Sequence, residues 1–354
     1  MNNKQLNDLF DDLPTSPRMF PEEIDFEERV VHFCRMNRET YALSAFLDDR
    51  KTRIDRNNYK VRLDYILNNF GSINSTPRAI NWIFHTPHSG STLIARALNE
   101  LEGSFVLKEP TLLVQASSLK RHPKFQQWER SRDWHRFFTM VQELLSRTFT
   151  KTDVALIKTT SVCHNLVDDI FCSTRPARGL FLYSSLEKYL ISLYKGNYLD
   201  AYINAGFEGV LHDIRHLLPL ESGEVEKLPH NRKVALLWLS VVISLSTYMK
   251  DNPDKKMLAL DCQQFFSERE ASLAILADHF GYPHDIVSIE TIINGPVFNR
   301  DAKMENRRWD AAAASDINQR ARNRFSAEIE DALYWIEELS SNIKLQHPIP
   351  LFSQ

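Results

Sequence analysis

Short apolar runs alternate with longer stretches of helical periodicity along most of this chain. Five runs bounded by turn-forming residues predict strands, at 79–85, 104–107, 154–158, 179–183 and 257–260. Apolar residues at helical spacing predict helices between them, at about 91–101, 125–149, 186–195, 230–250 and 264–280. A repeated succession of strand, helix and strand is typical of βαβ units. The pattern therefore predicts an α/β fold with a mainly parallel sheet flanked by helices.

The two ends of the chain show helical spacing without such strands. Over 21–50, and again over 59–70 with Gly71 as a C-cap, apolar residues recur at intervals of about one helical turn. Near the other end, a single apolar face predicts one helix over 316–341. We thus expect a helical N-terminal extension, 1–77, followed by an α/β domain, 78–354.

The overall charge limits the classes of partner. The net charge of this 354-residue chain is -3, so no general field attracts nucleic acid or an anionic membrane. We expect neither as a partner, and any anion site must be local. The longest apolar run, 234–249, contains three serines and a threonine. It is shorter than the roughly 20 residues that a membrane span needs, and it predicts a buried core helix.

The cysteines indicate a reducing compartment. Cys34, Cys163, Cys172 and Cys262 are scattered, without the close spacing of a zinc ribbon or a disulfide framework. The N-terminal residues are polar and acidic and do not resemble a signal peptide. We therefore expect reduced thiols in a cytoplasmic protein.

The stretch "FHTPHSGSTLIARALNE" runs from the first predicted strand of the sheet into a helix. A turn centred on Gly90 can direct several backbone N–H groups at an anion, and the helix dipole adds partial positive charge. Ser89, Ser91 and Thr92 supply hydroxyl groups. In a Walker loop, G-x-x-x-x-G-K-[ST], aligned on Gly90, the first glycine falls on His85 and the lysine on Ser91. The loss of these two defining residues argues against an ordinary ATPase or GTPase. The alternative is a Ser/Gly turn that binds nothing.

Within this stretch, "TPHSGSTL" resembles the loop that binds 3′-phosphoadenosine 5′-phosphosulfate (PAPS) in sulfotransferases, which typically reads P-[KR]-S-G-[ST]-T. Four later stretches resemble successive segments of that family: "DVALIKTTS", "GLFLYSSLEKYLISLYKG", "MLALDCQQFFSEREASLAILADHFGY" and "GPVFNRDAKM". The resemblance implies a sulfotransferase-like P-loop fold of a divergent bacterial type. It also implies transfer of a sulfuryl group from PAPS, without a metal, to a hydroxyl or amine of a small-molecule or peptide acceptor.

The same resemblance implies roles for residues of the loop. His88 occupies the position of the family's lysine or arginine, and histidine is only partly charged at neutral pH. The implied contacts of the 5′-phosphosulfate are His88, Ser89, Gly90, Ser91 and Thr92. Alternatively, His88 is a neutral histidine of a turn.

Two further residues match catalytic positions. Glu109 lies 21 positions after His88 (109 minus 88), as does the catalytic base in tyrosylprotein sulfotransferases. Lys158 matches the lysine that contacts the transferred sulfuryl oxygens. Thr160 replaces the catalytic histidine of cytosolic sulfotransferases and cannot act as a base near pH 7, so Glu109 is the better candidate. The alternatives are that Glu109 pairs with Lys108 or caps the next segment, and that Lys158 is a surface cation.

The 3′-phosphate site departs most from the family pattern. The family has an arginine and, eight residues later, a serine, whereas this chain has Ser184 and Ser192. A serine recovers only part of a bidentate arginine–phosphate contact. Lys188 on the same predicted helix, or Arg300 and Lys303 on the C-terminal loop, are possible substitutes.

The missing cations keep other functions open. One is a kinase-like enzyme that uses an ordinary nucleotide, and another is a non-catalytic protein that retains the fold for nucleotide sensing or partner binding. A separate motif, "HDIRH", places His212 and His216 four residues apart with Asp213 between them, as in zinc-binding helices. Aspartate is shorter than the glutamate of the zinc motif and no third ligand is evident in the sequence, so a solvated helix face is the preferred interpretation.

Overall fold

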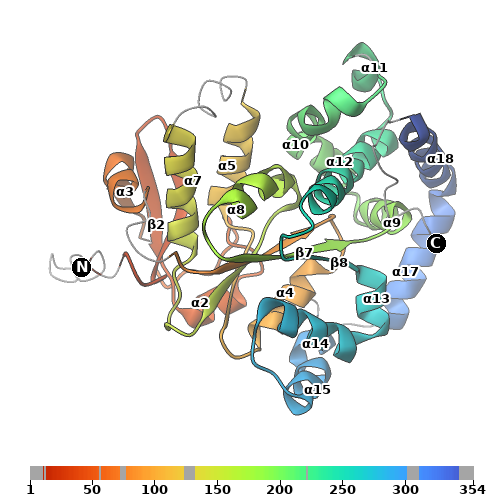
Figure 1. Cartoon of the computed structure of the whole chain (residues 1–354). Helices are drawn as coiled ribbons and strands as arrows, with labels where there is room; N and C mark the ends of the chain where they lie inside the picture. Colours follow the sequence, from red (N-terminus) through yellow and green to blue (C-terminus); the bar gives the residue numbers. More distant parts are fainter. Residues whose placement is uncertain are drawn as a thin grey trace.

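A five-stranded parallel sheet forms the centre of the molecule in this computed structural model (Figure 1). The model describes residues 11, 13–55, 57–71, 77–122, 132–220, 222–300 and 311–342. The strand order is β5-β6-β4-β7-β8, and every neighbouring pair is parallel. The strands are β4 (Ile80–His85), β5 (Ser104–Lys108), β6 (Val154–Lys158), β7 (Ala177–Tyr183) and β8 (Met257–Asp261). The predicted α/β fold and all five predicted strands are therefore confirmed.

Helices cover both faces of this sheet. Alternate residues of a strand point to opposite faces, and on β6 Ile157 faces one apolar core while Leu156 faces the other. Below the sheet in Figure 1 lie α4 (Ser91–Asn99), α14 (Arg269–Phe280) and α15 (Ile286–Asn294). Above it lie α5 (Thr111–Arg121), α7 (Arg132–Leu145), α8 (Val167–Cys172) and α12 (His230–Asp251). The sheet is thus the middle layer of three.

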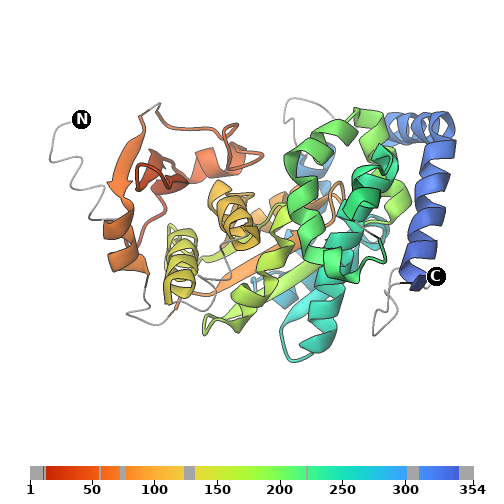
Figure 2. The ribbon, with the colours of Figure 1, turned by 90° about the horizontal axis from the view of Figure 1, so that it is seen from above.

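The N-terminal segment is not the helical extension that we predicted. It forms an antiparallel sheet of β1 (Met19–Asp25), β2 (Val30–Arg35) and β3 (Tyr59–Arg62), with two short helices, α2 (Arg38–Leu43) and α3 (Leu63–Phe70). Figure 2 shows this sheet at one end of the molecule. Its apolar side chains share a core with α5 and α7. Because β1 and β2 are buried on both faces, their apolar runs lack the alternation that identifies a strand. The division of the chain at residue 77 stays a prediction.

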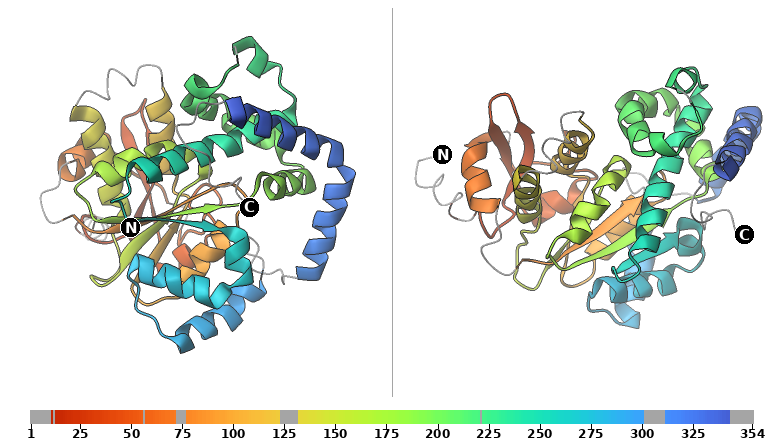
Figure 3. Two further views of the ribbon diagram at one scale, coloured as in Figure 1. Left: turned by 45° about the vertical axis from the view of Figure 1, so that its right-hand side comes forward. Right: turned by 45° about the horizontal axis from the view of Figure 1, so that its top comes forward.

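The C-terminal helical pattern also divides. The predicted helix over 316–341 consists of α17 (Ala311–Arg324) and α18 (Ser326–Asn342), which meet at an angle in Figure 3. At the break, the Phe325 ring stacks on Tyr194 of α9 (Leu186–Gly196), with ring centroids 4.5 Å apart. The predicted helix over 264–280 likewise consists of α13 (Cys262–Ser267) and α14. Tertiary packing thus interrupts patterns that look continuous in the sequence.

The apolar run at 234–249 lies within α12. By length and composition alone, this helix is the one in the described part of the chain that could cross a membrane. Of the most apolar 18 residues of this helix, 67% are buried within the fold, in agreement with the predicted core helix. It packs against α10 (Leu199–Ile214) and α18. The remaining short elements are η1 (Ser161–Leu166), η2 (Arg215–Leu217), α11 (Ser222–Glu226) and α16 (Pro296–Asn299).

Candidate functional site

The topology places a crevice at the end of β4. This strand comes first in the parallel sheet, yet it lies in the middle, between β6 and β7. The connection after β4 leads to β5 on one side of the sheet, and the connection after its neighbour β7 leads to β8 on the other side. Ligands of open α/β sheets bind at such a switch point. The loop between β4 and α4, with its motif around Gly90, lies there. The predicted anion loop therefore lies where the fold has room for a ligand.

The loop presents hydrogen-bond donors for which the described residues provide no acceptor. Gly90 is the N-cap of α4 and has a left-handed backbone, with φ 79°. Its carbonyl accepts from Leu93 and Ile94, whereas the first-turn N–H groups of Ser91 and Thr92 have no acceptor within the helix. The hydroxyl of Ser89 is buried and makes no hydrogen bond to any described residue. Such a group of unpaired donors at a helix N-terminus suits an anion.

His88 lies among tyrosines at the wall of the cavity. Its ring stacks on Tyr198, with centroids 5.8 Å apart and an interplanar angle of 15°. Its Nε2 atom is 3.2 Å from the hydroxyl oxygen of Tyr202. The backbone of His88 is left-handed, with φ 60°, which is uncommon for a residue other than glycine. The aromatic contacts and the backbone together determine where this imidazole lies.

Glu109 and Lys158 form an ion pair at the ends of adjacent strands. Lys158 Nζ donates a hydrogen bond to Glu109 Oε1, and the Glu109 N–H donates to the Lys158 carbonyl at 2.7 Å. The Lys158 side chain is 1% exposed and that of Glu109 is 16% exposed. Lys108 instead donates to the carbonyl of Ala42 at 2.9 Å. Glu109 thus pairs with Lys158 and not with Lys108, and Lys158 is not a surface cation.

Glu109 also has a strained backbone. Its φ of 55° lies in the left-handed region, which costs an L-residue roughly 1–2 kcal/mol. The backbone and side-chain bonds to Lys158 hold this conformation. Strained residues cluster at functional sites, so the backbone of Glu109 is an independent reason to examine this position.

His85, at the last position of β4, was missed by the sequence analysis. Its Nδ1 atom is 3.0 Å from the carbonyl oxygen of Thr86, and its Nε2 atom is 2.9 Å from that of Thr159. The same Nε2 atom lies 4.0 Å from Glu109 Oε1. One signal was available, because His85 occupies the first glycine position of the Walker alignment. We treated that position only as a mismatch.

These groups surround one cavity of about 570 Å³. Its polar end comprises His85, Glu109, Lys158 and Arg50 together with four loop residues, His88, Gly90, Ser91 and Thr92; Ser89 is not among the lining residues. Arg50 forms an ion pair with Asp48. The rest of the lining is mainly apolar and comes from several elements: Phe46, Val114, Val162, Ala201, Val210, Leu237 and Val241. The cavity therefore joins a charged end to an apolar chamber.

Three of the residues predicted to contact a 3′-phosphate, Ser184, Ser192 and Arg300, do not line this cavity. Ser184 is buried, and its N–H donates to Thr86 Oγ1 at 2.9 Å, which ties the end of β7 to the loop. Ser192 is half-buried on α9, and Arg300 is exposed. Lys303 lies outside the described residues. Contacts from these four residues to a ligand stay predictions.

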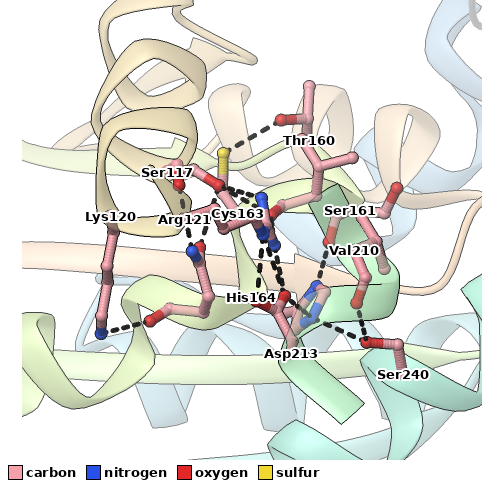
Figure 4. Close-up of polar contacts among 12 residues, drawn as sticks. Ser117, Lys120, Arg121, Thr160, Ser161, Cys163, His164, Val210, Asp213 and Ser240 are labelled. Atoms are coloured by element: carbon pink, nitrogen blue, oxygen red, sulfur yellow. Dashed lines mark hydrogen bonds and ion pairs between the residues drawn. The ribbon is translucent and has the colours of Figure 1, made fainter. Parts of the chain in front are cut away.

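The structure does not support the zinc alternative. α10 ends at Ile214, so His212 and His216 lie on different elements, and both are exposed. Asp213 instead contacts Arg121 and His164 (Figure 4). Within the described ranges, no group of three or more His, Cys, Asp or Glu residues could hold a metal.

The Asp213 contacts belong to a buried polar network behind the cavity. His164 Nε2 lies 3.0 Å from Asp213 Oδ2 and 3.1 Å from Ser240 Oγ, and its Nδ1 lies 2.8 Å from the Ser161 carbonyl (Figure 4). Burial alone would raise the pKa of Asp213, but hydrogen bonds from His164 and Arg121 outweigh it and lower the pKa. Ser161 lines the cavity, so the network supports one wall of the site.

Comparison with known proteins gives matches in structure but none in sequence. No protein-family model matches the chain. No curated protein matches it either. A sulfotransferase domain from the curacin biosynthetic pathway is 11% identical, with a TM-score of 0.42, and the match covers 71% of this chain and 99% of that one. A sulfotransferase from Alicyclobacillus acidocaldarius is 11% identical, with a TM-score of 0.37. That match covers 74% of this chain and 96% of the Alicyclobacillus chain.

A mouse sulfotransferase, SULT7A1, in a structure described as complexed with PAP, is also 11% identical. Its TM-score is 0.37, and the match covers 81% of this chain and 91% of that chain. Identities and TM-scores this low do not assign the chain to a family. The function proposed below therefore depends on the chain's own residues.

Proposed function

We propose that this protein transfers a sulfuryl group from PAPS to a hydroxyl group of a small acceptor. The observation that supports the proposal is one cavity that is lined both by Ser91 and Thr92, at the start of α4, and by the Glu109–Lys158 pair. Sulfuryl transfer, like phosphoryl transfer, passes through a loose transition state, so positioning and electrostatic stabilisation are its main requirements. A loop rich in N–H donors, beside a lysine and a carboxylate, meets those requirements without a metal.

Each residue has a separate role in this reaction. Ser89, with the N–H groups of Ser91 and Thr92, would hold the phosphosulfate. The acceptor oxygen forms a bond to sulfur while the bond from sulfur to the bridging oxygen of the donor breaks. Glu109 takes the proton of the acceptor, and Lys158 stabilises negative charge on the sulfuryl oxygens. The products are a sulfate ester and 3′-phosphoadenosine 5′-phosphate (PAP).

The apolar chamber narrows the class of acceptor. Its lining from α5, α10 and α12 offers few hydrogen bonds, and its volume suits a drug-sized molecule. We therefore propose a mostly apolar small molecule that has one hydroxyl group, in preference to a peptide or an amine. Neither nucleic acid nor a membrane is proposed as a partner, and the proposed location is the cytoplasm.

Calorimetric titration with PAP, PAPS, ADP and ATP, each with and without magnesium, tests the donor. We expect PAP and PAPS to bind without metal and more tightly than ADP. Preference for ATP, together with turnover that requires magnesium, would indicate the kinase-like alternative. No heat with any of the four nucleotides would contradict both enzyme proposals.

A second candidate is a protein that binds a nucleotide without catalysis. Specific contacts favour it, because Lys158 and Arg50 both already have carboxylate partners and Ser184 is bonded to Thr86. A Glu109→Gln variant separates the two candidates. A non-catalytic protein would keep its nucleotide affinity and its cellular role in that variant, whereas a transferase would lose turnover.

A further inference from the structure

His85 has an oxygen acceptor at each of its two ring nitrogens. Nδ1 faces the carbonyl of Thr86 at 3.0 Å, and Nε2 faces the carbonyl of Thr159 at 2.9 Å. A carbonyl oxygen can only accept, so each contact is a hydrogen bond only if that nitrogen carries a proton. A neutral imidazole has one N–H group and would leave a lone pair facing one of these oxygens. The imidazolium satisfies both contacts.

The charged groups around His85 fit this state. Glu109 Oε1 lies 4.0 Å from Nε2 and is also the acceptor for Lys158 Nζ. Arg50 and His88 line the same cavity, and Arg50 is paired with Asp48. Among the described residues, the carboxylate of Glu109 therefore lies near His85, pairs with Lys158 and also interacts electrostatically with Arg50. That carboxylate and the two carbonyl oxygens oppose the repulsion between His85 and Lys158.

We propose that His85 is a doubly protonated positioning residue that neighbours the same Glu109 oxygen as Lys158 and adds positive charge at the base of the loop. The loop has Ser91 where a Walker loop has its lysine, and its other candidate cation, His88, contacts tyrosines. His85 lines the cavity at the base of the same loop, so its charge acts on any anion bound there.

A consequence for the reaction rests on the proposed function. Lys158 cannot give its full charge to a sulfuryl group while it is bonded to Glu109. When Lys158 moves toward the donor, Glu109 keeps His85 as its neighbouring cation and stays aimed at the acceptor. The proton balance is unchanged, because the acceptor's proton goes to Glu109 and His85 keeps both of its own protons.

Nitrogen-15 NMR of the histidine side chains in the wild-type protein tests the protonation state directly. At pH 8 we expect both ring nitrogens of His85 to carry protons, and exposed His212 serves as the comparison in the same spectrum. The His85 signals are assigned through bonds from its backbone, so the result does not depend on a variant that folds. A single protonated nitrogen in His85 at pH 7 would overturn the proposal.

PAP binding tests the role of this charge. In His85→Gln we expect about tenfold weaker binding of PAP, the effect of losing one charge-assisted contact. His212→Gln, the same change at an exposed histidine, should bind like the wild type. Equal affinity in a folded His85→Gln protein would contradict the electrostatic role. If wild-type protein binds no PAP while His85 is doubly protonated, the proposed donor is wrong and the assignment of His85 stands.

Discussion

Lys158 Nζ donates a hydrogen bond to Glu109 Oε1 across a sequence separation of 49 residues. The register of the parallel sheet explains the pairing, because Lys108 of β5 lies opposite Lys158 of β6, and Glu109 is the next residue. The left-handed backbone of Glu109 then turns its side chain back toward the end of β6. Two residues that the sequence suggests separately thus form one functional unit.

We expect Glu109→Gln to lower the rate of sulfuryl transfer by roughly 10²-fold or more, because an amide cannot accept the proton. PAP affinity should change little, since the donors of the loop are untouched. Single-turnover kinetics and calorimetry measure the two effects. Glu102→Gln, at an exposed residue near the start of β5, is the matched control. A Glu109→Gln protein with wild-type turnover would exclude Glu109 as the base.

Gly90→Ala should abolish nucleotide binding and destabilise the protein. The added Cβ would lie 2.8 Å from the ring of Phe266, and the left-handed backbone costs a further 1–2 kcal/mol, roughly. Urea unfolding and PAP titration measure these effects. Gly223→Ala is the control, because its Cβ would meet no atom within 4 Å. Wild-type affinity in Gly90→Ala would show that the loop does not bind the nucleotide.

Asp213→Asn should lower the free energy of unfolding by about 3–5 kcal/mol at pH 7, because Arg121 and His164 lose a buried counter-charge. The pKa of Asp213 is lower in the folded than in the unfolded protein. Its stabilisation is therefore complete above the ordinary aspartate value of about 4 and is lost as the pH falls through the lower folded value.

Urea unfolding of wild type and Asp213→Asn, at a series of pH values from 7 down to the acid transition, measures this dependence. The difference between the two proteins should shrink below about pH 4. Asp254→Asn, at an exposed position, should be neutral throughout. A constant difference across the series would show that the charge of Asp213 is not what stabilises the network.

Thiol labelling should modify one cysteine of the native protein. Cys172 is exposed, whereas the other three thiols are buried. Burial raises the pKa of Cys34 to about 12 and that of Cys163 and Cys262 to about 11, so they are not thiolates near neutral pH. A coloured disulfide reagent at pH 8 should release one equivalent from the native protein and four after unfolding. Cys172→Ser should remove the native signal, and a second fast-reacting thiol would contradict the fold around the others.

The pattern of apolar and polar residues predicted the strands of the parallel sheet correctly but not those of the N-terminal sheet. The five strands of the parallel sheet were predicted within two residues of their ends, because each is a short apolar run between turns. The N-terminal sheet was mistaken for helices, because β1 and β2 bury both faces and have no alternation. Gly90 was predicted correctly as the centre of the loop. Its left-handed backbone at the N-cap of α4 is a conformation that glycine adopts without strain.

The sequence by itself determined the five strands of the parallel sheet and the glycine turn at the end of β4, since both depend on neighbouring residues. Only the tertiary structure decided that Lys158, and not Lys108, pairs with Glu109, and that His85 lies between two carbonyl groups. Those contacts depend on the strand order β5-β6-β4 and on its register. Strand order and register arise from packing of the whole chain, and no local period along the sequence encodes them.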